Sequence, residues 1–296
     1  MITNPVLKYY GGKFRLAKWI ISHFPQHEHY VEPFGGGGSI LFQKPESRVE
    51  TYNDLDGDVV NFFRVVRDRP DDLVRAITLT PWARDEFERC VSNYIEDCKE
   101  NLAARLSYPD VDLENARRLY VRLWMSRHAG TIGTLSSWRR NMSKRSPASD
   151  IRPRVIYDAA ERLRKVQIEN RDALKLIGEM DSGKTLFYLD PPYVTETRTN
   201  KKRYAHELTD AGHAAIAAAA KAVKGFVVLS GYACDLYKKL YQDAGWKRID
   251  IETVANGGVK RTESLWLNPR TITALADRSW DGVSDPALMS NALQTK

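Results

Sequence analysis

The chain has 296 residues, of which 43% are apolar and 28% charged, so it is long enough for one large or two modest folded domains. Its formal net charge of +7 and pI of about 9.2 favour a polyanionic partner. No run of about 18 apolar residues and no signal-peptide core is present, so we expect a cytoplasmic protein without membrane contact. Three scattered cysteines show neither a disulfide framework nor metal-ligand spacing, and we expect no metal site.

The excess positive charge lies in one segment. Residues 122–154 contain eight basic residues and one acidic residue, Asp150, whereas the rest of the chain carries basic and acidic residues in equal number. Lysine and arginine residues gathered in this way are typical of a surface that contacts nucleic-acid phosphates. A solvated basic face without a partner is the alternative for this segment.

The first predicted elements are two short strands, each followed by a loop. Residues 29–32 end at the loop 33–38, which contains four consecutive glycines, and residues 49–52 end at the polar corner 53–56. Both runs are typical of buried strands. Loops in these positions are typical of parallel strands that carry functional residues at their carboxyl ends.

Residues 59–154 interrupt this pattern of strands and loops. One helix is expected to begin with Thr80 as its N-cap and Pro81 as its first residue, and another to cover residues 115–126, where apolar residues recur in helical phase. No convincing strand bounded by glycine occurs in this part of the sequence. We interpret it as an inserted, mainly helical domain that includes the basic segment.

Strands and helices alternate again after residue 155. The expected strands are 185–189, 225–229, 249–254 and 264–267, and the expected helices are 210–224 and 234–244. This alternation predicts an α/β fold with a Rossmann-like, doubly wound, mostly parallel sheet and an antiparallel C-terminal hairpin. The boundaries that follow are 1–58 and 155–270 for the two parts of the catalytic domain, 59–154 for the insertion, and 271–296 for a polar, poorly ordered tail.

The glycine-rich loop and a following carboxylate indicate an adenosine-type cofactor. Glycines 35–38 let the backbone approach a ligand closely where a helix is expected to begin. Asp54 stands at the end of the next strand, where a carboxylate can accept hydrogen bonds from both hydroxyls of a ribose. The dinucleotide pattern G-x-G-x-x-G fails because Ile40 occupies the third glycine position, which argues against a pyrophosphate.

The motif Asp190-Pro191-Pro192-Tyr193 directly follows the predicted strand 185–189. The prolines fix the backbone, so that the Asp190 carboxylate and the Pro191 carbonyl can accept hydrogen bonds from one amino group. Two acceptors on an exocyclic amine would localise the nitrogen lone pair for in-line attack on an electrophilic methyl group. The Tyr193 ring is expected to be available for stacking on the base. A rigid turn without catalytic function is the alternative.

Five stretches of the sequence occur together in an order that marks one enzyme family. They resemble motifs of the Dam-like DNA adenine-N6 methyltransferases of the D12 class, α group, over about residues 7–270: Tyr9-Tyr10-Gly11-Gly12-Lys13, Val31-Glu32-Pro33-Phe34-Gly35-Gly36-Gly37-Gly38-Ser39, Asn53-Asp54, Asp190-Pro191-Pro192-Tyr193, and Asn256-Gly257-Gly258 followed by Glu263-Ser264-Leu265. In this group the target recognition domain is inserted between the glycine loop and the Asp-Pro-Pro-Tyr motif. The basic segment lies in that insertion.

The resemblance implies S-adenosylmethionine as the cofactor, without a metal ion. Catalysis is expected from Asp190, Pro191, Pro192 and Tyr193. Asp54 is expected to bind the ribose, and Asp172 belongs to a stretch that stands where the family has a further cofactor-lining strand end. The full set of expected cofactor-binding residues is Tyr9, Tyr10, Gly12, Lys13, Glu32, Pro33, Phe34, Gly35, Gly37, Asp54, Asp172 and Asp190.

The resemblance also implies double-stranded DNA as the partner and flipping of the target base. Arg139 and Arg140 beside Trp138 are expected to read bases or to wedge the strands apart, and Lys144 and Arg145 to bind phosphates. Residues 128–138 depart from the pattern of the GATC-acting members, which leaves the target sequence open. The expected DNA-binding residues are Arg127, Trp138, Arg139, Arg140, Lys144, Arg145, Arg198, Lys201, Lys202, Arg203 and Asn256.

We therefore expect a monomeric, bacterial or phage-encoded enzyme that transfers a methyl group to the N6 amine of a flipped-out adenine in a specific DNA site. One alternative is a methyltransferase acting on RNA or on cytosine N4, against which the Asp-led motif and the insertion argue. Another is a catalytically silent DNA-binding relative, against which the intact Lys13, Asp54 and Asp190 argue. A phage, orphan or restriction-modification role is not distinguished.

Overall fold

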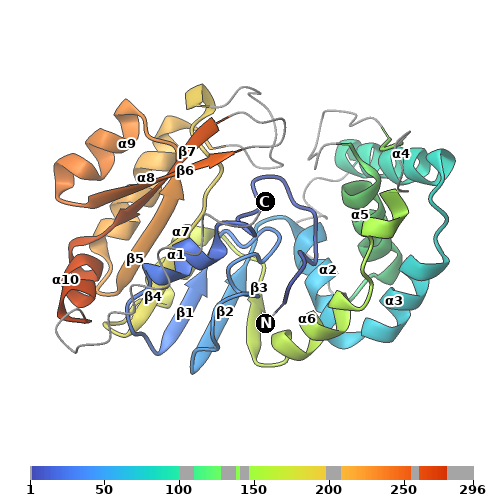
Figure 1. Ribbon diagram of the computed structural model, residues 1–296, viewed down its shortest axis with the longest axis horizontal. Coiled ribbons are helices and arrows are strands. Elements are labelled where there is room, and N and C mark those ends of the chain that lie inside the picture. Colours follow the sequence, from blue (N-terminus) through green and yellow to red (C-terminus); the bar gives the residue numbers. More distant parts are fainter. Residues whose placement is uncertain are drawn as a thin grey trace.

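The structure, a computed structural model, describes residues 2–100, 110–127, 138–140, 147–197, 208–254 and 260–278. A seven-stranded sheet with the order β3-β2-β1-β4-β5-β7-β6 forms its centre (Figure 1). The first five strands in this order are mutually parallel, and β7 runs antiparallel to both β5 and β6. The strands are β1 His29–Glu32, β2 Val49–Asn53, β3 Val166–Glu169, β4 Thr185–Leu189, β5 Phe226–Gly231, β6 Lys247–Val254 and β7 Lys260–Leu267. The predicted fold class, including the antiparallel C-terminal hairpin, is confirmed.

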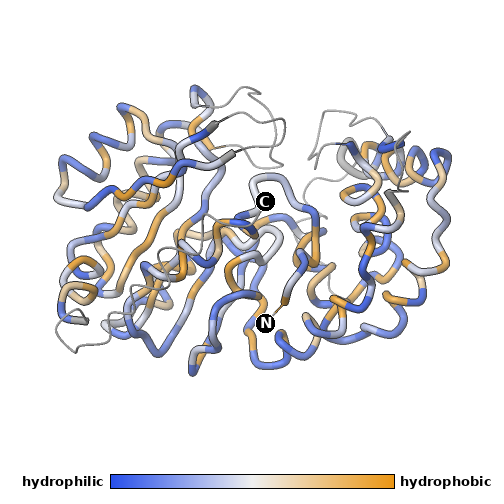
Figure 2. Tube along the Cα trace, viewed as in Figure 1, coloured by the Kyte–Doolittle hydropathy of each residue, from blue (hydrophilic) through white to orange (hydrophobic). Residues whose placement is uncertain are grey.

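The central strands β4 and β5 are mostly apolar because both of their faces are covered. All residues of β4 and β5 are buried. Leu186 and Tyr188 belong to the hydrophobic cluster on one face of the sheet, whereas Phe187 and Leu189 belong to the cluster on the other. This period of two is the geometry of a strand buried on both sides. The apolar colouring of the strands in the middle of the sheet follows from it (Figure 2).

Helices cover both faces of the sheet. The helices α1 Ala17–Ser22, α2 Gly57–Asp68, α6 Val155–Leu163 and α10 Pro269–Arg278 pack into the cluster that contains Tyr188, and α7 Ala173–Glu179, α8 Asp210–Ala222 and α9 Asp235–Leu240 into the cluster that contains Phe187. The predicted helix 210–224 is confirmed. The predicted helix 234–244 divides into α9 and a short 3-10 turn, Gln242–Ala244.

The inserted part of the chain is helical, as expected. It contains most of α2 together with α3 Pro70–Leu79, α4 Arg84–Glu100 and α5 Leu113–Met125, which lie to the right of the sheet in Figure 1. Its core is continuous with that of the sheet, because the Phe63 ring packs on Tyr52 of β2 at 5.2 Å and on Phe62 at 5.3 Å. Phe62 in turn stacks on Tyr120 of α5 at 6.2 Å. The domain boundaries remain a prediction.

One expected helix start is wrong. Thr80 and Pro81 do not start a helix: Thr80 ends α3, with its hydroxyl donating to the Ala76 carbonyl at 2.8 Å, and α4 begins only at Arg84. Pro70 occupies the first turn of α3, and Pro269 is the first residue of α10.

The polar tail is ordered at least as far as Arg278. Residues 269–278 form α10, whose Thr271 is fully buried and accepts a hydrogen bond from the Val227 N–H at 3.1 Å. Ile272 and Leu275 contact the core from this helix. Their spacing of three provides the apolar stripe, which the polar composition of the segment obscures. No helix in the described ranges is long and apolar enough to span a membrane.

Candidate active site

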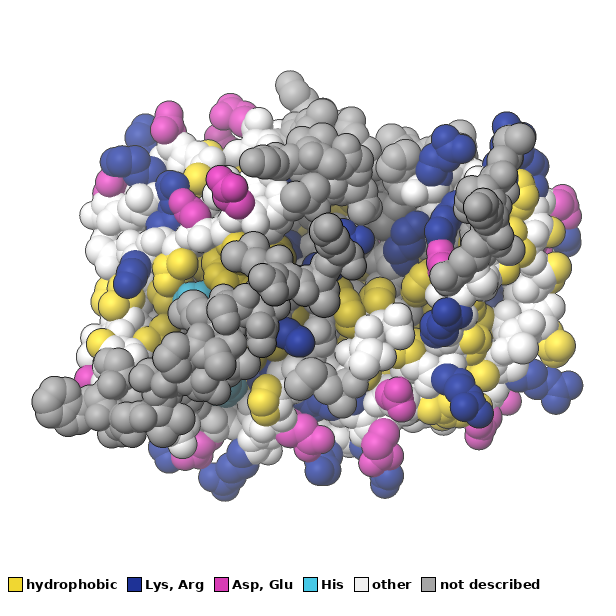
Figure 3. All heavy atoms as spheres, viewed as in Figure 1, with side chains coloured by type: hydrophobic (Ala, Val, Ile, Leu, Met, Phe, Trp, Pro, Cys, Tyr) yellow, Lys and Arg dark blue, Asp and Glu magenta, His cyan; other side chains and the backbone are white. Residues whose placement is uncertain are grey.

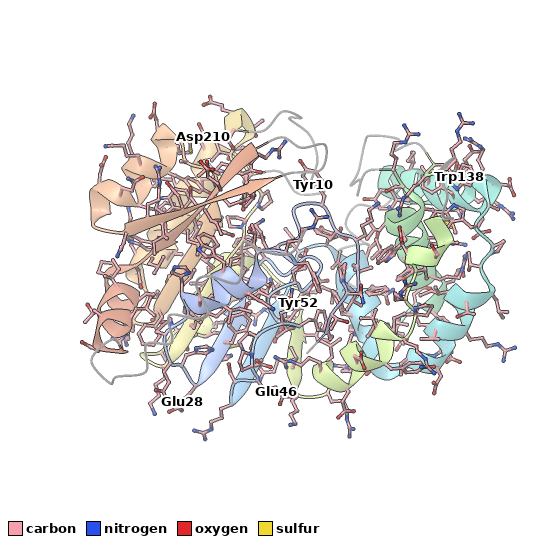
Figure 4. All side chains as sticks on the ribbon, in the orientation of Figure 1. Tyr10, Glu28, Glu46, Tyr52, Trp138 and Asp210 are labelled. Atoms are coloured by element: carbon pink, nitrogen blue, oxygen red, sulfur yellow. The ribbon has the colours of Figure 1, made fainter. Side chains whose placement is uncertain are left out.

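A cavity opens at the carboxyl edge of β1, β2 and β4, where the loops after these strands meet the segment 9–13. It contains about 850 Å³ of empty space, which includes the solvent at its open mouth. Figure 4 shows Tyr10 at this edge and Tyr52 on β2 below it. Ten of the residues expected to bind a cofactor line this cavity: Tyr9, Tyr10, Gly12, Lys13, Glu32, Phe34, Gly35, Gly37, Asp54 and Asp190.

The glycine loop lies flat between two tyrosines. A Cβ atom on Gly35 would stand 2.1 Å from Cε2 of Tyr52, and one on Gly37 would stand 3.0 Å from Cβ of Tyr9. Gly36 also requires a positive φ of 48°. The Tyr52 hydroxyl donates to the Gly36 carbonyl at 2.6 Å and fixes the loop on the ring. The sequence predicted that a regular helix begins after this loop. The loop leads instead into consecutive turns.

Asp54 joins the glycine loop to the loop after β2. Its Oδ2 accepts the Gly36 N–H at 2.7 Å, and its Oδ1 accepts the Asp56 N–H at 2.8 Å. Burial and the neighbouring Asp56 raise the pKa of Asp54 to about 7. Each carboxylate oxygen can accept a second hydrogen bond, so the group can still bind a ligand hydroxyl.

Glu32 lies in the floor of the cavity at the end of β1. Its Oε2 accepts hydrogen bonds from the Tyr30 hydroxyl at 2.9 Å and from the Leu41 N–H at 3.2 Å. Burial is the main cause that raises its pKa to about 8, and the negative charge of Asp190 adds to it. A ligand cation in the cavity would favour the ionised form of this carboxyl group.

Asp190 is held by partners from two distant parts of the chain. Its Oδ1 accepts the Ser230 hydroxyl at 2.7 Å and lies 3.1 Å from the Lys13 ammonium, which also donates to the Gly11 carbonyl at 2.7 Å. Burial lowers the pKa of Lys13, but the negative charges of Asp190 and, second to it, of Glu263 raise this pKa by more. The pKa of Lys13 therefore lies above its usual value. Lys13 is therefore a buried ammonium paired with a carboxylate.

The Tyr193 ring is more enclosed than the sequence indicated. Only 5% of the residue is exposed, the Lys13 ammonium lies 4.6 Å from the ring centroid, and the Tyr232 ring meets it edge-on at 4.7 Å. The Tyr193 hydroxyl donates to Oε2 of Glu263 at 3.0 Å. The expectation of a ring available for stacking is thus wrong for this arrangement, because the ring is packed against its own protein.

Comparison with known proteins identifies the family. Residues 9–254 match the family model of the D12 class N6 adenine-specific DNA methyltransferases. The chain belongs to this family. Among its relatives is the Type II methyltransferase M1.LlaDCHI of Lactococcus lactis subsp. cremoris, which is 25% identical over 264 residues, covering 86% of this chain and 89% of the relative. The DNA adenine methylase of Haemophilus influenzae is 25% identical over 275 residues, covering 84% and 86%. The chain is accordingly an enzyme that methylates adenine in DNA, and the RNA and cytosine-N4 alternatives are set aside.

The cavity of this D12 methyltransferase fits the positively charged cofactor that the family implies. Four carboxyl groups line it, those of Glu32, Asp54, Asp56 and Asp190, and the ammonium of Lys13 is already paired with Asp190. Phe34, Ile40 and Leu55 add apolar surface for a planar base. A cation with ribose hydroxyls and an adenine ring suits these donors, acceptors and apolar groups. No group of three potential metal ligands occurs among the described residues.

Two residues expected at the cofactor do not lie on the cavity. Asp172 is exposed and is the N-cap of α7, where its Oδ1 accepts the N–H groups of Leu174 and Lys175 at 3.0 and 3.1 Å. This is a structural role that aspartate commonly has at the start of a helix. Pro33 instead accepts the Asn53 side-chain amide at 2.9 Å through its carbonyl and joins β1 to β2.

Sequence reasoning missed several residues of the site. Ser230 follows the predicted strand 225–229 and was assigned no role, although β5 lies next to β4 and therefore brings its end beside Asp190. Asp56 had a detectable signal, since it follows Asp54 by two residues in the same acidic corner. The remaining lining residues without a prior assignment are Gly11, Gly36, Ser39, Ile40, Leu55, Tyr188 and Leu208.

The residues expected to contact DNA have different environments. Trp138 is half-buried on the insertion (Figure 4), where its ring packs with a small cluster that includes Phe87 and Met125 and lies 4.9 Å from the Arg84 guanidinium. Arg139 forms an ion pair with Asp150. Arg127 and Arg140 are exposed, and the expectation that Arg139 and Arg140 beside Trp138 read bases or wedge the strands apart stays a prediction. Lys144, Arg145, Arg198, Lys201, Lys202, Arg203 and Asn256 lie outside the described residues.

Proposed function

We propose that this methyltransferase transfers the methyl group of S-adenosylmethionine to N6 of an adenine flipped out of double-stranded DNA, and that the cavity at the carboxyl edge of β1, β2 and β4 holds the cofactor. The observation that carries the proposal is that Asp190 and the glycine loop line one cavity although they lie more than 150 residues apart in the sequence. Methyl donor and acceptor must meet in line, which requires one shared site.

Asp190 and the Pro191 carbonyl are the proposed acceptors for the two N–H groups of the adenine amine. Their hydrogen bonds withdraw the nitrogen lone pair from the ring and direct it toward the methyl carbon. S-adenosylmethionine supplies an electrophilic methyl group on a sulfonium. The nitrogen lone pair would form the new N–C bond as the C–S bond breaks, the electron pair of that bond would stay on the sulfur of S-adenosylhomocysteine, and the proton lost by the amine would pass to solvent through the Asp190 carboxylate. Ser230 and Lys13 hold Asp190 in place through Oδ1 during this step.

Asp54 is proposed to hold the cofactor ribose, and the segment 9–13 to cover the cofactor. Arg127, Arg140 and the basic residues outside the described ranges are proposed to contact DNA phosphates, with the target base sequence read within the insertion. Because a base inside a duplex is inaccessible, the reaction requires the adenine to leave the stack. We propose that the enzyme acts as a monomer, which light scattering after size-exclusion chromatography tests.

The experiment that tests this function is a methyl-transfer assay on purified protein. Labelled S-adenosylmethionine is incubated with unmethylated duplex DNA, with single-stranded RNA, and with a duplex that lacks adenine, followed by mass spectrometry of the nucleosides. We expect N6-methyldeoxyadenosine from the first substrate alone. N4-methylcytosine, methylated RNA or no product would each contradict the proposal. Sequencing of the methylated DNA then identifies the recognition site.

A further inference from the structure

The strand β7 presents two side chains to the residues around Asp190. Arg261 and Glu263 are two positions apart and therefore lie on the same face of the strand. Glu263 accepts the Tyr193 hydroxyl at 3.0 Å, and Nη1 of Arg261 donates to the Tyr232 hydroxyl at 3.2 Å. One strand thus fixes the hydroxyl ends of two tyrosines that follow β4 and β5.

These two tyrosines form a unit with the catalytic carboxylate. Their rings meet edge-on, with centroids 4.7 Å apart and planes at 79°. The Lys13 ammonium lies over the Tyr193 ring at 4.6 Å and 3.1 Å from Oδ1 of Asp190. A displacement of the Tyr193 ring would therefore disturb the cation that pairs with Asp190.

We infer that Glu263 is a positioning residue, which holds the Tyr193 ring by its hydroxyl against the Lys13 ammonium and so keeps Asp190, the partner of that ammonium, in the position that accepts the target amine. The inference rests on the proposed function, in which a flipped adenine is held at the Asp-Pro-Pro-Tyr motif. The motif alone does not supply this constraint, because Glu263 lies 70 residues further along the chain.

The hydroxyl of a tyrosine lies on the axis about which its ring turns, so a hydrogen bond there does not restrict that turn. It fixes the far end of the side chain and so opposes rotation about the Cα–Cβ bond, which would move the Tyr193 ring away from Lys13. This restraint requires an acceptor oxygen within reach of the hydroxyl, which a carboxylate or an amide can supply. Without the hydrogen bond, a smaller fraction of enzyme–DNA complexes would hold Asp190 in the position that accepts the target amine, and kcat would fall while cofactor binding would not change.

Two conservative variants separate the hydrogen bond from the charge. Glu263→Gln keeps an acceptor oxygen at the same reach but removes the charge, whereas Glu263→Asp keeps the charge but withdraws it by one methylene group. We expect kcat of Glu263→Gln within about threefold of wild type, and kcat of Glu263→Asp and Tyr193→Phe each lowered about tenfold. The double variant Glu263→Asp/Tyr193→Phe is expected to be no slower than either single variant, because both remove the same bond.

The matched control is Glu252→Asp, which makes the same change at an exposed glutamate on the neighbouring strand β6 and is expected to behave as wild type. Calorimetric titration of cofactor binding and the thermal unfolding midpoint are measured for every variant and are expected to stay at wild-type values.

Three results would overturn the inference: wild-type kcat in Glu263→Asp, a kcat for Glu263→Gln as low as that for Glu263→Asp, or multiplicative losses in the double variant. A loss that appears only as weaker cofactor binding would also overturn it. These comparisons require a wild-type enzyme that methylates adenine. A wild type without that activity contradicts the proposed function. An active wild type together with an unaffected Glu263→Asp variant contradicts the inference alone.

Discussion

The cofactor cavity and the helical insertion use charged residues in different ways. In the cavity each charge has a fixed, largely buried partner, as Lys13 has in Asp190 and Asp54 has in two backbone N–H groups. On the right-hand side of Figure 3, where the insertion lies, both basic and acidic side chains are at the surface. Part of the basic excess is used inside the protein, since Arg122 pairs with the buried Asp58. Net charge along the sequence therefore overstates the charge that faces a partner.

Two arginines of the segment 122–154 illustrate this internal use. Arg122 lies 3.5 Å from the buried Asp58, with its guanidinium 3.4 Å from the centre of the Tyr94 ring, and Arg139 pairs with Asp150. The contacts of Arg122 join α5 to α2 and α4, and the ion pair of Arg139 joins it to the 3-10 turn Pro147–Asp150. Arg127 and Arg140, by contrast, are exposed and are the described members of the predicted DNA-binding set that remain on the surface.

The largest expected effect is at Asp190. Replacing it by alanine removes the proposed acceptor of the target amine, so methyl transfer should fall by about a thousandfold or more, while duplex binding is retained. The matched control is Asp172→Ala, which removes the cap of α7 and should cost about 1 kcal/mol of stability with little loss of activity. A labelled-methyl assay and a binding titration measure both; substantial turnover by Asp190→Ala would refute the assignment.

The next effect concerns the glycine loop. Gly35→Ala places a Cβ against the Tyr52 ring and should lower the free energy of unfolding by about 1–3 kcal/mol and weaken cofactor binding. Gly178→Ala, inside α7 with no atom within 4 Å of the new Cβ, should instead be neutral or stabilise by about 0.5–1 kcal/mol. Denaturant unfolding and calorimetry compare the two. Equal behaviour of the two variants would show that close packing of the loop does not matter.

A smaller effect is expected on the insertion side. The double variant Arg127→Ala/Arg140→Ala should reduce the slope of log affinity against log salt concentration by about two for duplex DNA, if each arginine neutralises one phosphate. Cofactor binding should not change. Arg164→Ala, an exposed arginine on the loop after α6 that pairs with Glu161, is the matched control and should leave the slope unaltered. An unchanged slope in the double variant would remove both residues from the DNA interface.

The smallest effect is a pH dependence of cofactor binding. Because the pKa of Asp54 is about 7, its carboxylate forms between pH 6 and pH 8. The cofactor's ribose hydroxyls and positive charge favour that ionised form, so affinity should rise up to about tenfold over this range. The stability of the cofactor-free protein changes with pH in the opposite direction. Because the pKa of Asp54 is higher in the folded than in the unfolded state, its contribution to the free energy of unfolding is lost as pH rises through 7.

Calorimetric titrations at several pH values test this dependence, with Asp54→Asn as the comparison. The variant should bind the cofactor more weakly and with a flatter pH profile, because only the contribution of Glu32, whose pKa is about 8, would remain. A profile in Asp54→Asn as steep as in wild type would assign the ionisation to another group.

The sequence alone determined the features that depend on neighbouring residues. Strands that end in a glycine loop, an Asn-Asp corner and an Asp-Pro-Pro-Tyr turn predicted both the parallel sheet and the edge where the cavity lies, and ten of the expected cofactor-binding residues do line it. Local signals suffice here because all parallel strands place their carboxyl ends at the same edge.

Only the tertiary structure decided which distant groups meet. The sheet order places β5 beside β4 and β7 beside β5, which brings Ser230 to Asp190 and Glu263 to Tyr193. The enclosure of Tyr193, the capping role of Asp172 and the pairing of Arg139 with Asp150 depend on such packing as well. A residue type and its spacing indicate what a side chain can bind, but its actual partner is set by long-range contacts that no local pattern encodes.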